Sequence, residues 1–192
     1  MRRFLNEVLL ALTIALVGGI GTALLVIDRN RDSGAVTIGP WVARAGTTGP
    51  QDNPYARALV ATRIELPLDA AEGIVFTTSV DSTGEPLIST CDYRVGGAAP
   101  AARLWSLSAY DAIDGLMTTA NGRTVFHSQE IIRAEPGRFE IVVSQSVKPG
   151  NWLPVSADAD LLLVLRLYDT ALGTTLGGDA PVLPSIIRGR CR

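Results

Sequence analysis

Arg103-Leu-Trp-Ser-Leu-Ser-Ala-Tyr-Asp-Ala-Ile-Asp-Gly115 joins a strand pattern to a turn, and this combination decides the fold. Alternate residues of an extended chain point to opposite sides, so one side carries Trp105, Leu107 and Ala109. The other side carries Leu104, Ser106, Ser108 and Tyr110. Asp111 to Gly115 supply the aspartates and the glycine that favour a turn. We therefore predict a central β-strand that runs into a turn.

The same two-residue period recurs before and after this stretch. Gly73 to Asp81 alternates, and Ser82-Thr-Gly84 is predicted to turn the chain back. Arg138 to Val147 has the clearest alternation. It predicts an inward set of Phe139, Ile141 and Val143 and an outward set of Glu140, Ser144 and Ser146.

Three further segments complete the predicted strands. Leu161 to Tyr168 is apolar on both sides, so it is predicted to be central in its sheet. Shorter strands are predicted at Cys91 to Val95, ended by Gly96-Gly97, and at Val125 to Ile132. About seven short strands with turns between them and little helix predict a mainly β, antiparallel sandwich or barrel.

The β-sandwich domain is expected to span residues 54–192, with residues 28–53 as a linker or arm. The arm mixes charges, glycines and prolines, and Trp41 within it is expected to dock on the folded part. A short amphipathic helix is predicted to begin at Pro54, capped by Asp52 or Asn53. The tail from Gly173 is expected to form an extended cover.

A transmembrane helix is predicted at residues 8–27, because these twenty residues carry no charge. A helix needs about 20 such residues to cross ~30 Å of hydrocarbon. The alternative is a cleaved signal peptide, for which Gly21-Thr22-Ala23 offers a cleavage site. A signal's apolar core typically has about 7–15 residues, so the longer segment favours an uncleaved anchor.

The orientation of this helix rests on the domain that follows it. Arg2 and Arg3 on one side are balanced by Arg29 and Arg31 on the other. A short basic tail is easily retained in the cytoplasm, whereas a long following domain crosses largely regardless of charge. We therefore expect residues 1–7 in the cytoplasm, a single pass through the lipid of a bacterial inner membrane, and the carboxyl-terminal domain in the periplasm.

Cys91 and Cys191 are the two cysteines, and both follow the apolar segment. In an oxidising compartment they can pair and close a loop of about a hundred residues. The sequence does not show whether their Cα atoms come within reach, so two buried free thiols are the alternative.

Charge and composition exclude several functions. Past residue 27 there are fifteen basic and eighteen acidic residues without a dense block of either sign, which argues against a nucleic-acid partner. A single histidine, His127, and no nucleophile-elbow serine give little basis for a hydrolytic triad. The cysteine spacing does not suit zinc, and Asp111 with Asp114 supplies too few ligands for calcium. We expect neither a metal nor a cofactor.

Short motifs in a fixed order make the sequence similar to the bacterial family called domain of unknown function 1214. They are Gly39-Pro-Trp41, Pro54-Tyr55-Ala-Arg57, Cys91-Asp-Tyr-Arg94, Trp105-Ser-Leu with Tyr110-Asp111, Asn151-Trp-Leu-Pro154 and Leu165-Arg-Leu-Tyr168. The similarity runs from about Ile38 to the carboxyl end. The family's Asp-Ala-Asp-Gly turn is one residue longer here, at Asp111 to Gly115.

The resemblance implies a jelly-roll-like β-sandwich and no agreed activity or catalytic residues. It also implies that longer relatives carry a second domain, domain of unknown function 1254, ahead of this one. The present chain is interpreted as a stand-alone member without that domain. A separate protein that bears the companion domain is therefore the partner we expect.

Arginines and aromatic residues are the remaining candidates for a ligand site, because guanidinium groups and ring faces suit an anionic or sugar-like ligand. The alternative is that they are structural residues of the strands and turns. We favour a non-catalytic binding or assembly module, and the second hypothesis is a periplasmic enzyme or enzyme subunit acting on envelope glycans or a small anion. The candidate residues are Arg94, Arg103, Tyr110, Asn151, Trp152, Arg166 and Tyr168.

Overall fold

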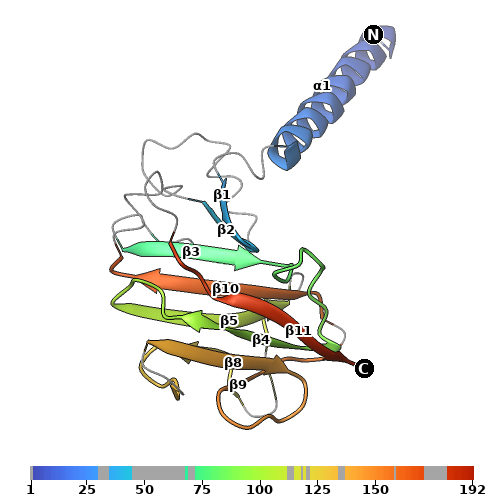
Figure 1. The fold of residues 1–192 in the computed structure, drawn as a ribbon. Helices are drawn as coiled ribbons and strands as arrows, with labels where there is room; N and C mark the ends of the chain where they lie inside the picture. The colour runs from blue at the N-terminus through green and yellow to red at the C-terminus, as the bar shows by residue number, and fades with distance from the viewer. Residues whose placement is uncertain are drawn as a thin grey trace.

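The computed structural model describes residues 2–29, 35–44, 68, 72–111, 115–117, 119, 122–133, 137–157, 159–170 and 181–192. Within these residues the chain forms helix α1 (Arg2–Arg29) and eleven β-strands (Figure 1). The helix predicted to begin at Pro54 and the predicted tail at Gly173 start outside the described residues. The strands are β1 (Ala35–Ile38), β2 (Trp41–Arg44), β3 (Gly73–Thr78), β4 (Cys91–Ala98), β5 (Leu104–Asp111), β6 (Gly115–Leu116), β7 (Val125–His127), β8 (Arg138–Ser144), β9 (Trp152–Pro154), β10 (Leu161–Tyr168) and β11 (Ser185–Cys191).

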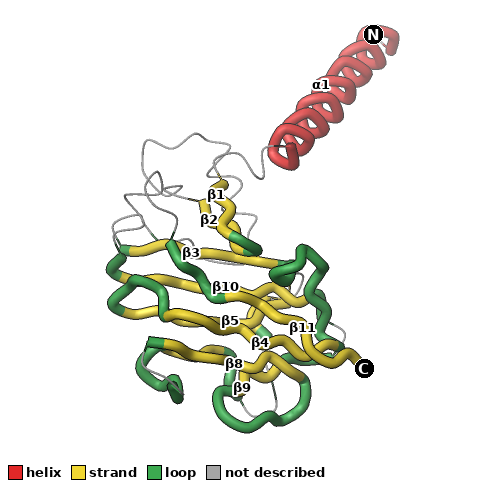
Figure 2. The backbone as a smooth tube through the Cα atoms, in the orientation of Figure 1, coloured by secondary structure: helices red, strands yellow, loops and turns green. Residues whose placement is uncertain are grey.

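These strands form two sheets that share one core (Figure 2). The seven-stranded sheet has the order β1-β2-β3-β10-β5-β6, with β7 also paired to β5, and the four-stranded sheet has the order β11-β4-β8-β9. Among the described strands, every pair is antiparallel except β8 and β9, which run parallel. The rings of Trp105 in β5 and Phe139 in β8 lie 4.5 Å apart between the two sheets. The predicted mainly β, layered fold is therefore confirmed, and the jelly-roll topology stays a prediction.

Strand β10 is central in the seven-stranded sheet, as its apolar faces predicted. It pairs with β3 along one edge and with β5 along the other. Leu163, Leu165 and Leu167 are completely buried on its inward face, and Val164 is completely buried on the opposite face. Each such side chain contributes about 1.5–3 kcal/mol through its removal from water.

Strand β5 follows the predicted alternation, and both of its faces are covered. Trp105 and Leu107 lie in the core, whereas Ser106 and Ser108 are buried on the other face. Asp111 pairs with Gly115 at the start of β6, and β5 and β6 are antiparallel.

The predicted end of a strand at Gly96-Gly97 is wrong, because β4 continues through both glycines. Gly96 pairs with Glu140 of β8 on one side and Ser185 of β11 on the other. A Cβ atom at Gly96 would lie 2.5 Å from the backbone oxygen of Phe139, and Gly97 has a φ of 141°. The glycines therefore allow a close approach of the strands and do not end β4.

Two other predicted strand boundaries need correction. The strand expected at Val125 to Ile132 ends at His127, where Glu130 N donates to the His127 carbonyl and closes a turn. The last residues of the predicted covering tail form β11, which pairs with β4 as the outer strand of the four-stranded sheet.

Ser144 at the end of β8 is buried, although the alternation predicted an outward position. Its hydroxyl donates to Asp92 Oδ1 of the neighbouring strand over 2.5 Å. A hydroxyl that has found a buried partner no longer needs water, which explains why the alternation failed at this residue.

The hairpin of β1 and β2 belongs to the seven-stranded sheet, although it falls within the expected arm. Strand β2 pairs with β3, and Trp41 at its start is completely buried. The indole Nε1 of Trp41 donates to the Pro184 carbonyl over 2.7 Å. The expected docking of Trp41 is thus confirmed, and it joins the hairpin to the segment ahead of β11.

Replacing Trp41 by phenylalanine is expected to lower the free energy of unfolding by about 1–2 kcal/mol. The ring's apolar contacts are largely kept, but the Pro184 carbonyl loses its buried donor. Urea denaturation followed by far-ultraviolet circular dichroism measures the change. A variant as stable as the natural protein would contradict this role of the hydrogen bond.

The loop between β3 and β4 covers part of the outer edge of β11. Ser82 N donates to the Ile186 carbonyl over 2.9 Å, and the Ser82 hydroxyl accepts from Ile186 N over 2.8 Å. Two residues further along β11, the Arg188 guanidinium donates to the Pro86 carbonyl. These contacts satisfy backbone groups of the loop and of the outer strand together.

Asp81 holds this loop to β11 through a buried ion pair. Its Oδ2 lies 3.1 Å from Arg188 Nε, and only 2% of its side chain is exposed. Its Oδ1 accepts from Thr83 N, the Thr83 hydroxyl and Glu85 N. Burial alone raises the pKa of Asp81, but the hydrogen bonds from Thr83 and Glu85 and the charge of Arg188 bring that pKa below its usual value.

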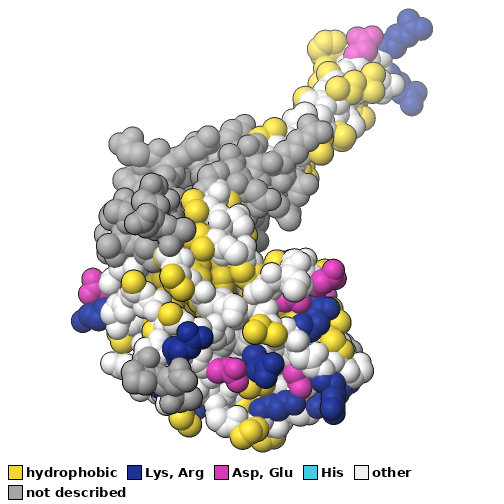
Figure 3. Space-filling view, viewed as in Figure 1, with side chains coloured by type: hydrophobic (Ala, Val, Ile, Leu, Met, Phe, Trp, Pro, Cys, Tyr) yellow, Lys and Arg dark blue, Asp and Glu magenta, His cyan; other side chains and the backbone are white. Residues whose placement is uncertain are grey.

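Helix α1 is long and apolar enough to cross a membrane, and its most apolar window buries none of its surface in the rest of the structure. A signal sequence has the same properties. The hydroxyls of Thr13 and Thr22 donate to the carbonyls of Leu9 and Gly18 within the helix, over 2.8 and 2.7 Å. The polar groups of both threonines are thus satisfied without water, as hydrocarbon requires. Figure 3 shows apolar side chains along the helix and charged ones at its amino-terminal end.

Candidate functional site

An open hollow of about 270 Å³ lies on the outward face of the four-stranded sheet. Strand β8 contributes Arg138 and Glu140, which are exposed on the same face because they are two residues apart. Strand β4 contributes Arg94, whose strand partner is Val142. The hollow is also lined by Gly96, Gly97, Phe139, Ser185 and Ile187.

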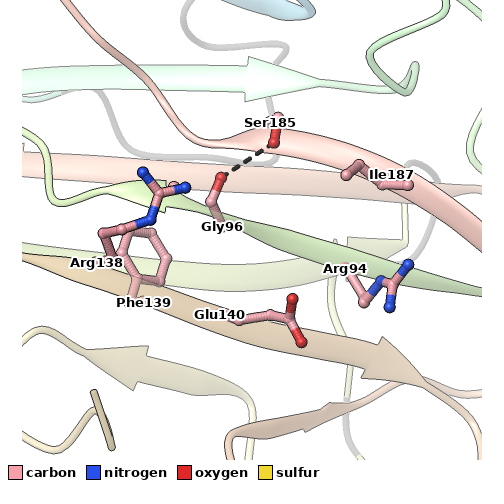
Figure 4. A pocket seen from close by; sticks show the side chains of 8 residues that line it. Arg94, Gly96, Arg138, Phe139, Glu140, Ser185 and Ile187 are labelled. Carbon is pink, nitrogen blue, oxygen red and sulfur yellow. Dashed lines mark hydrogen bonds between the residues drawn. The ribbon is translucent and has the colours of Figure 1, made fainter. Parts of the chain in front are cut away.

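The strand register places the charged side chains of the hollow in a row. Glu140 lies between Arg138 and Arg94, with Gly96 directly opposite it on β4 (Figure 4). Neighbours on one face of a strand are about 6.5–7 Å apart, and adjacent strands about 4.8 Å apart. The hydroxyl of Ser185 on β11 donates to the Gly96 carbonyl over 3.1 Å. Basic and acidic side chains alternate across this face (Figure 3).

Arg94 and Glu140 differ from most charged residues of the β body. Neither side chain makes a hydrogen bond or ion pair with another residue in the described part of the chain. By contrast, Arg103 pairs with Asp169 and Lys148 pairs with Asp92. The fold therefore leaves one guanidinium and one carboxylate of the hollow available to a ligand.

Asp92 lies two residues before Arg94 on the same face of β4, and its carboxylate is fully engaged. Oδ2 accepts from Lys148 Nζ over 2.6 Å, and Oδ1 accepts from the Ser144 hydroxyl. Burial alone raises the pKa of Asp92, but the bonds from Lys148 and Ser144 and the positive charges of Lys148 and Arg192 lower it below its usual value. This cluster serves stability at the rim of the face.

The lowered pKa of Asp92 predicts a loss of stability in acid. A carboxylate whose pKa is lower in the folded state stabilises the fold above its unfolded value near ~4 and loses that contribution as the pH falls below it. We expect Asp92→Asn to be less stable than the natural protein at pH 7 by about 1–2 kcal/mol, with the difference shrinking below about pH 4. Denaturant midpoints measured from pH 7 to pH 3 test this, and a difference that stays constant over the range would contradict it.

His127 lines a second hollow with Arg123 and Glu130. The predicted strand from Val125 to Ile132 placed His127 inside a strand. In the structure His127 is the last residue of β7, and its side chain is exposed. Glu130 accepts from His127 N over 2.9 Å and pairs with Arg123 over 3.2 Å. The backbone bond from His127 and the charge of Arg123 lower the pKa of Glu130, which is the opposite of what a general acid at neutral pH needs.

The other predicted arginines and tyrosines lie in strands of the seven-stranded sheet or, for Arg103, directly before β5. Arg166 of β10 donates to the Tyr110 hydroxyl of β5 over 3.2 Å, so these two are brought together. Arg103 pairs with Asp169 at the surface, where both side chains are more than two-thirds exposed. Tyr168 is half-buried at the end of β10. None of these four lines the hollow around Arg94.

Asn151 and Trp152 have structural contacts. The Asn151 amide donates to the carbonyls of Ile132 and Glu140 over 2.8 Å each and accepts from Ile132 N over 2.9 Å. It thereby fixes the segment before β8 against that strand. Trp152 Nε1 donates to the Ser144 carbonyl over 2.9 Å. Asn151 and Trp152 therefore act as structural residues in this fold, and their polar groups are used by contacts within it.

Cys91 and Cys191 form a disulfide between β4 and β11, at directly opposed positions of the two strands. The sequence left open a disulfide or two free thiols, and the structure has the disulfide. Among the described residues, no group of three or more histidine, cysteine, aspartate or glutamate side chains is placed to hold a metal ion.

The sequence candidates for a ligand site included one residue of the hollow, Arg94, and missed its neighbours on the adjacent strands. The alternate positions of Arg138 and Glu140 along β8 predict that both side chains point outward on one face, since charged residues of such a strand face the solvent. What the sequence lacked was the register that sets Arg94 beside them.

A family model described as "Protein of unknown function (DUF1214)" matches residues 72–172. The crystal structure of the VPA0106 protein from Vibrio parahaemolyticus is similar in fold, with a TM-score of 0.57 and 22% identity, covering 71% of this chain and 35% of that one. An uncharacterized protein from Burkholderia cenocepacia gives a TM-score of 0.47 and 18% identity, covering 89% of this chain and 41% of that one. The chain thus spans well under half the length of either protein. No curated protein matches the sequence.

Proposed function

This chain belongs to the DUF1214 family of proteins of unknown function, and we propose that it is a membrane-tethered periplasmic β-sandwich that binds a partner or ligand and catalyses no reaction. The fold is common to many activities, so the proposal rests on the particular features of this chain.

The observation that carries the proposal is the exposed apolar helix ahead of a β body. The most apolar window of α1 buries nothing in the structure. An exposed apolar surface of this length is costly in water, and a bilayer removes that cost. The helix therefore supports attachment to a membrane, and the long domain that follows supports its export.

The disulfide supports the periplasmic side of the membrane. Bonds such as that between Cys91 and Cys191 persist in oxidising compartments and are rare where thiol reductants are abundant. The cysteine pair and the helix thus favour the same location independently.

A binding role is supported by how the polar residues are used. Arg103, Arg166, Asn151 and Trp152 are engaged in contacts within the fold, and they lie on separate elements. The hollow around Arg94 offers charge and hydrogen bonds, and the Ser185 hydroxyl in it donates to the Gly96 carbonyl and not to a carboxylate.

We further propose that the partner is a separate protein with the companion domain implied by the family resemblance. The chain covers 35% of the VPA0106 protein, so in that protein the shared fold is joined to a much longer remainder. A module that is covalently joined to other parts in one protein is suited to bind them in another.

Membrane attachment and orientation are tested with a bacterial strain that expresses the full chain fused at its carboxyl end to alkaline phosphatase. We expect the fusion to resist extraction by carbonate, to be active, and to keep the amino-terminal residues by intact mass. A matched variant with Leu12, Leu16 and Leu24 changed to arginine is expected to be released from the membrane. An inactive fusion would contradict the periplasmic orientation, and loss of the first residues would favour the cleaved signal peptide.

The partner is tested by co-expressing the full chain with a companion-domain protein from the same genome and purifying the complex in mild detergent. We expect a stoichiometric complex by native mass spectrometry. A lone monomer under these conditions would count against an assembly role and would leave the membrane result unaffected.

A further inference from the structure

We propose that the outward face of the four-stranded sheet binds the same face of a second copy of this chain, with the two copies related by a twofold axis. In this dimer, Arg94 of each copy pairs with Glu140 of the other copy. The contact is distinct from the companion-domain partner proposed above, and it depends neither on that partner nor on the orientation of the helix in the membrane.

One row of side chains crosses all four strands of this face. The strand registers set Ile187 of β11 opposite Arg94 of β4, and Arg94 opposite Val142 of β8. Val142 is in turn opposite Trp152 of β9. Ile187 is 51% exposed, and Val142 and Trp152 are half-buried. Apart from Arg94 the row is therefore apolar, although it lies on the outside of the sheet.

Arg94 and Glu140 are exposed neighbours on this face, and neither has a partner among the described residues. Glu140 lies two residues before Val142, so the two charges hold diagonal positions on adjacent strands (Figure 4). Such positions are about 7–8 Å apart. Asp92, the acidic residue of the same face of β4, is already paired with Lys148. One guanidinium and one carboxylate leave this pair without net charge, so it selects neither an anion nor a cation.

A face with these two charges is complementary to itself. A twofold axis perpendicular to the sheet, passing between Arg94 and Glu140, sets each guanidinium over the carboxylate of the other copy. Two ion pairs then form together, and the planar guanidinium fork fixes their alignment. A protein of another sequence would need both charges at matching positions, whereas a second copy supplies them by symmetry.

The shape of the face suits a weak, reversible dimer. Gly96, directly opposite Glu140, adds no side chain, and the Ser185 hydroxyl beside it donates to the Gly96 carbonyl. Three strands of seven or eight residues and the short β9 give a face of roughly 400 Å². Stable interfaces bury about 800 Å² on each partner, so we expect the dimer to depend on protein concentration.

Sedimentation velocity of the full chain in mild detergent tests the proposal. We expect a monomer–dimer equilibrium between about 1 and 100 μM protein that high salt weakens, because salt screens exposed ion pairs. Arg94→Glu and Glu140→Arg are each expected to weaken the dimer by at least about tenfold, because each sets two pairs of like charges across the axis.

Combining the two changes distinguishes this contact from other modes of association. The double variant Arg94→Glu with Glu140→Arg exchanges the two charges, so it is expected to recover the dimer. A mixture of the two single variants is expected to form a mixed dimer for the same reason. Arg103→Glu reverses an exposed charge next to the other sheet and is expected to leave association unchanged. Circular dichroism confirms that each variant is folded.

A monomer at every concentration would overturn the proposal. A dimer that Arg94→Glu and Glu140→Arg leave unchanged would also overturn it and would place the contact elsewhere, for example on helix α1. A double variant that associates no better than the single ones would overturn the direct pairing of the two residues. The companion-domain protein is absent from these samples, so each result is independent of the membrane and partner experiments above.

Discussion

Breaking the disulfide between Cys91 and Cys191 is expected to lower the free energy of unfolding by about 4–5 kcal/mol. The cysteines are 100 residues apart in sequence, so the bond removes a large loop entropy from the unfolded chain. For a chain of this length, the loss corresponds to a melting temperature lower by about 10–15 °C. Differential scanning calorimetry of the oxidised and reduced natural protein measures the change without any substitution.

A double variant, Cys91→Ala with Cys191→Ser, controls for effects of the reductant. Alanine suits the buried position of Cys91, and serine suits the exposed position of Cys191. The variant is expected to match the reduced natural protein and to be insensitive to reductant. A difference below about 1 kcal/mol between the oxidised and reduced proteins would show that the end of β11 opens independently of the rest.

Replacing Asp81 by alanine is expected to cost about 3–5 kcal/mol, because it leaves the partly buried Arg188 guanidinium without its counter-charge. The change also removes the acceptor of three hydrogen bonds from Thr83 and Glu85, which hold the loop before β4. Urea denaturation at pH 7 measures the loss.

The exposed pair of Arg103 and Asp169 provides a matched control for Asp81. Arg103→Ala is expected to cost less than about 1 kcal/mol, because both side chains of that pair are largely in water. Asp169 is kept, since its φ of 50° would strain an alanine there. Asp81→Asn retains a hydrogen-bond acceptor, so its loss of stability is expected to lie between that of Asp81→Ala and that of the control. Since the pKa of Asp81 is lowered in the folded protein, its advantage over asparagine is expected to shrink as the pH falls below about 4. Equal losses from Asp81→Ala and Arg103→Ala would contradict the importance of burial.

Much of the fold was predictable where one physical effect dominates a segment. The leucines of β10 and the alternating residues of β8 are buried where the two-residue period placed them. Prediction from the sequence failed where one residue type suits two different structural roles. Glycine favours turns but also permits close strand approach, so Gly96 was predicted to end β4 when it lies between two neighbours. Ser144 is polar, yet a partner on another strand keeps it buried.

The candidate site was less predictable because it depends on contacts between distant segments. Arg94 and Arg138 are 44 positions apart in the numbering, and only the pairing of β4 with β8 places them on one face. The hydrogen bond from Arg166 to the Tyr110 hydroxyl likewise depends on the register of β10 and β5. Such registers are set by the whole core, so they cannot be obtained from any single stretch of sequence.

The contacts of Ser82 and Arg188 along β11 have a consequence for encounters between copies of the protein. An unpaired outer strand is a template on which the strand of a second chain can add. The backbone groups of Ile186 are already occupied by Ser82, and Arg188 extends over the same edge. Self-association by strand addition is thereby hindered along the first half of β11.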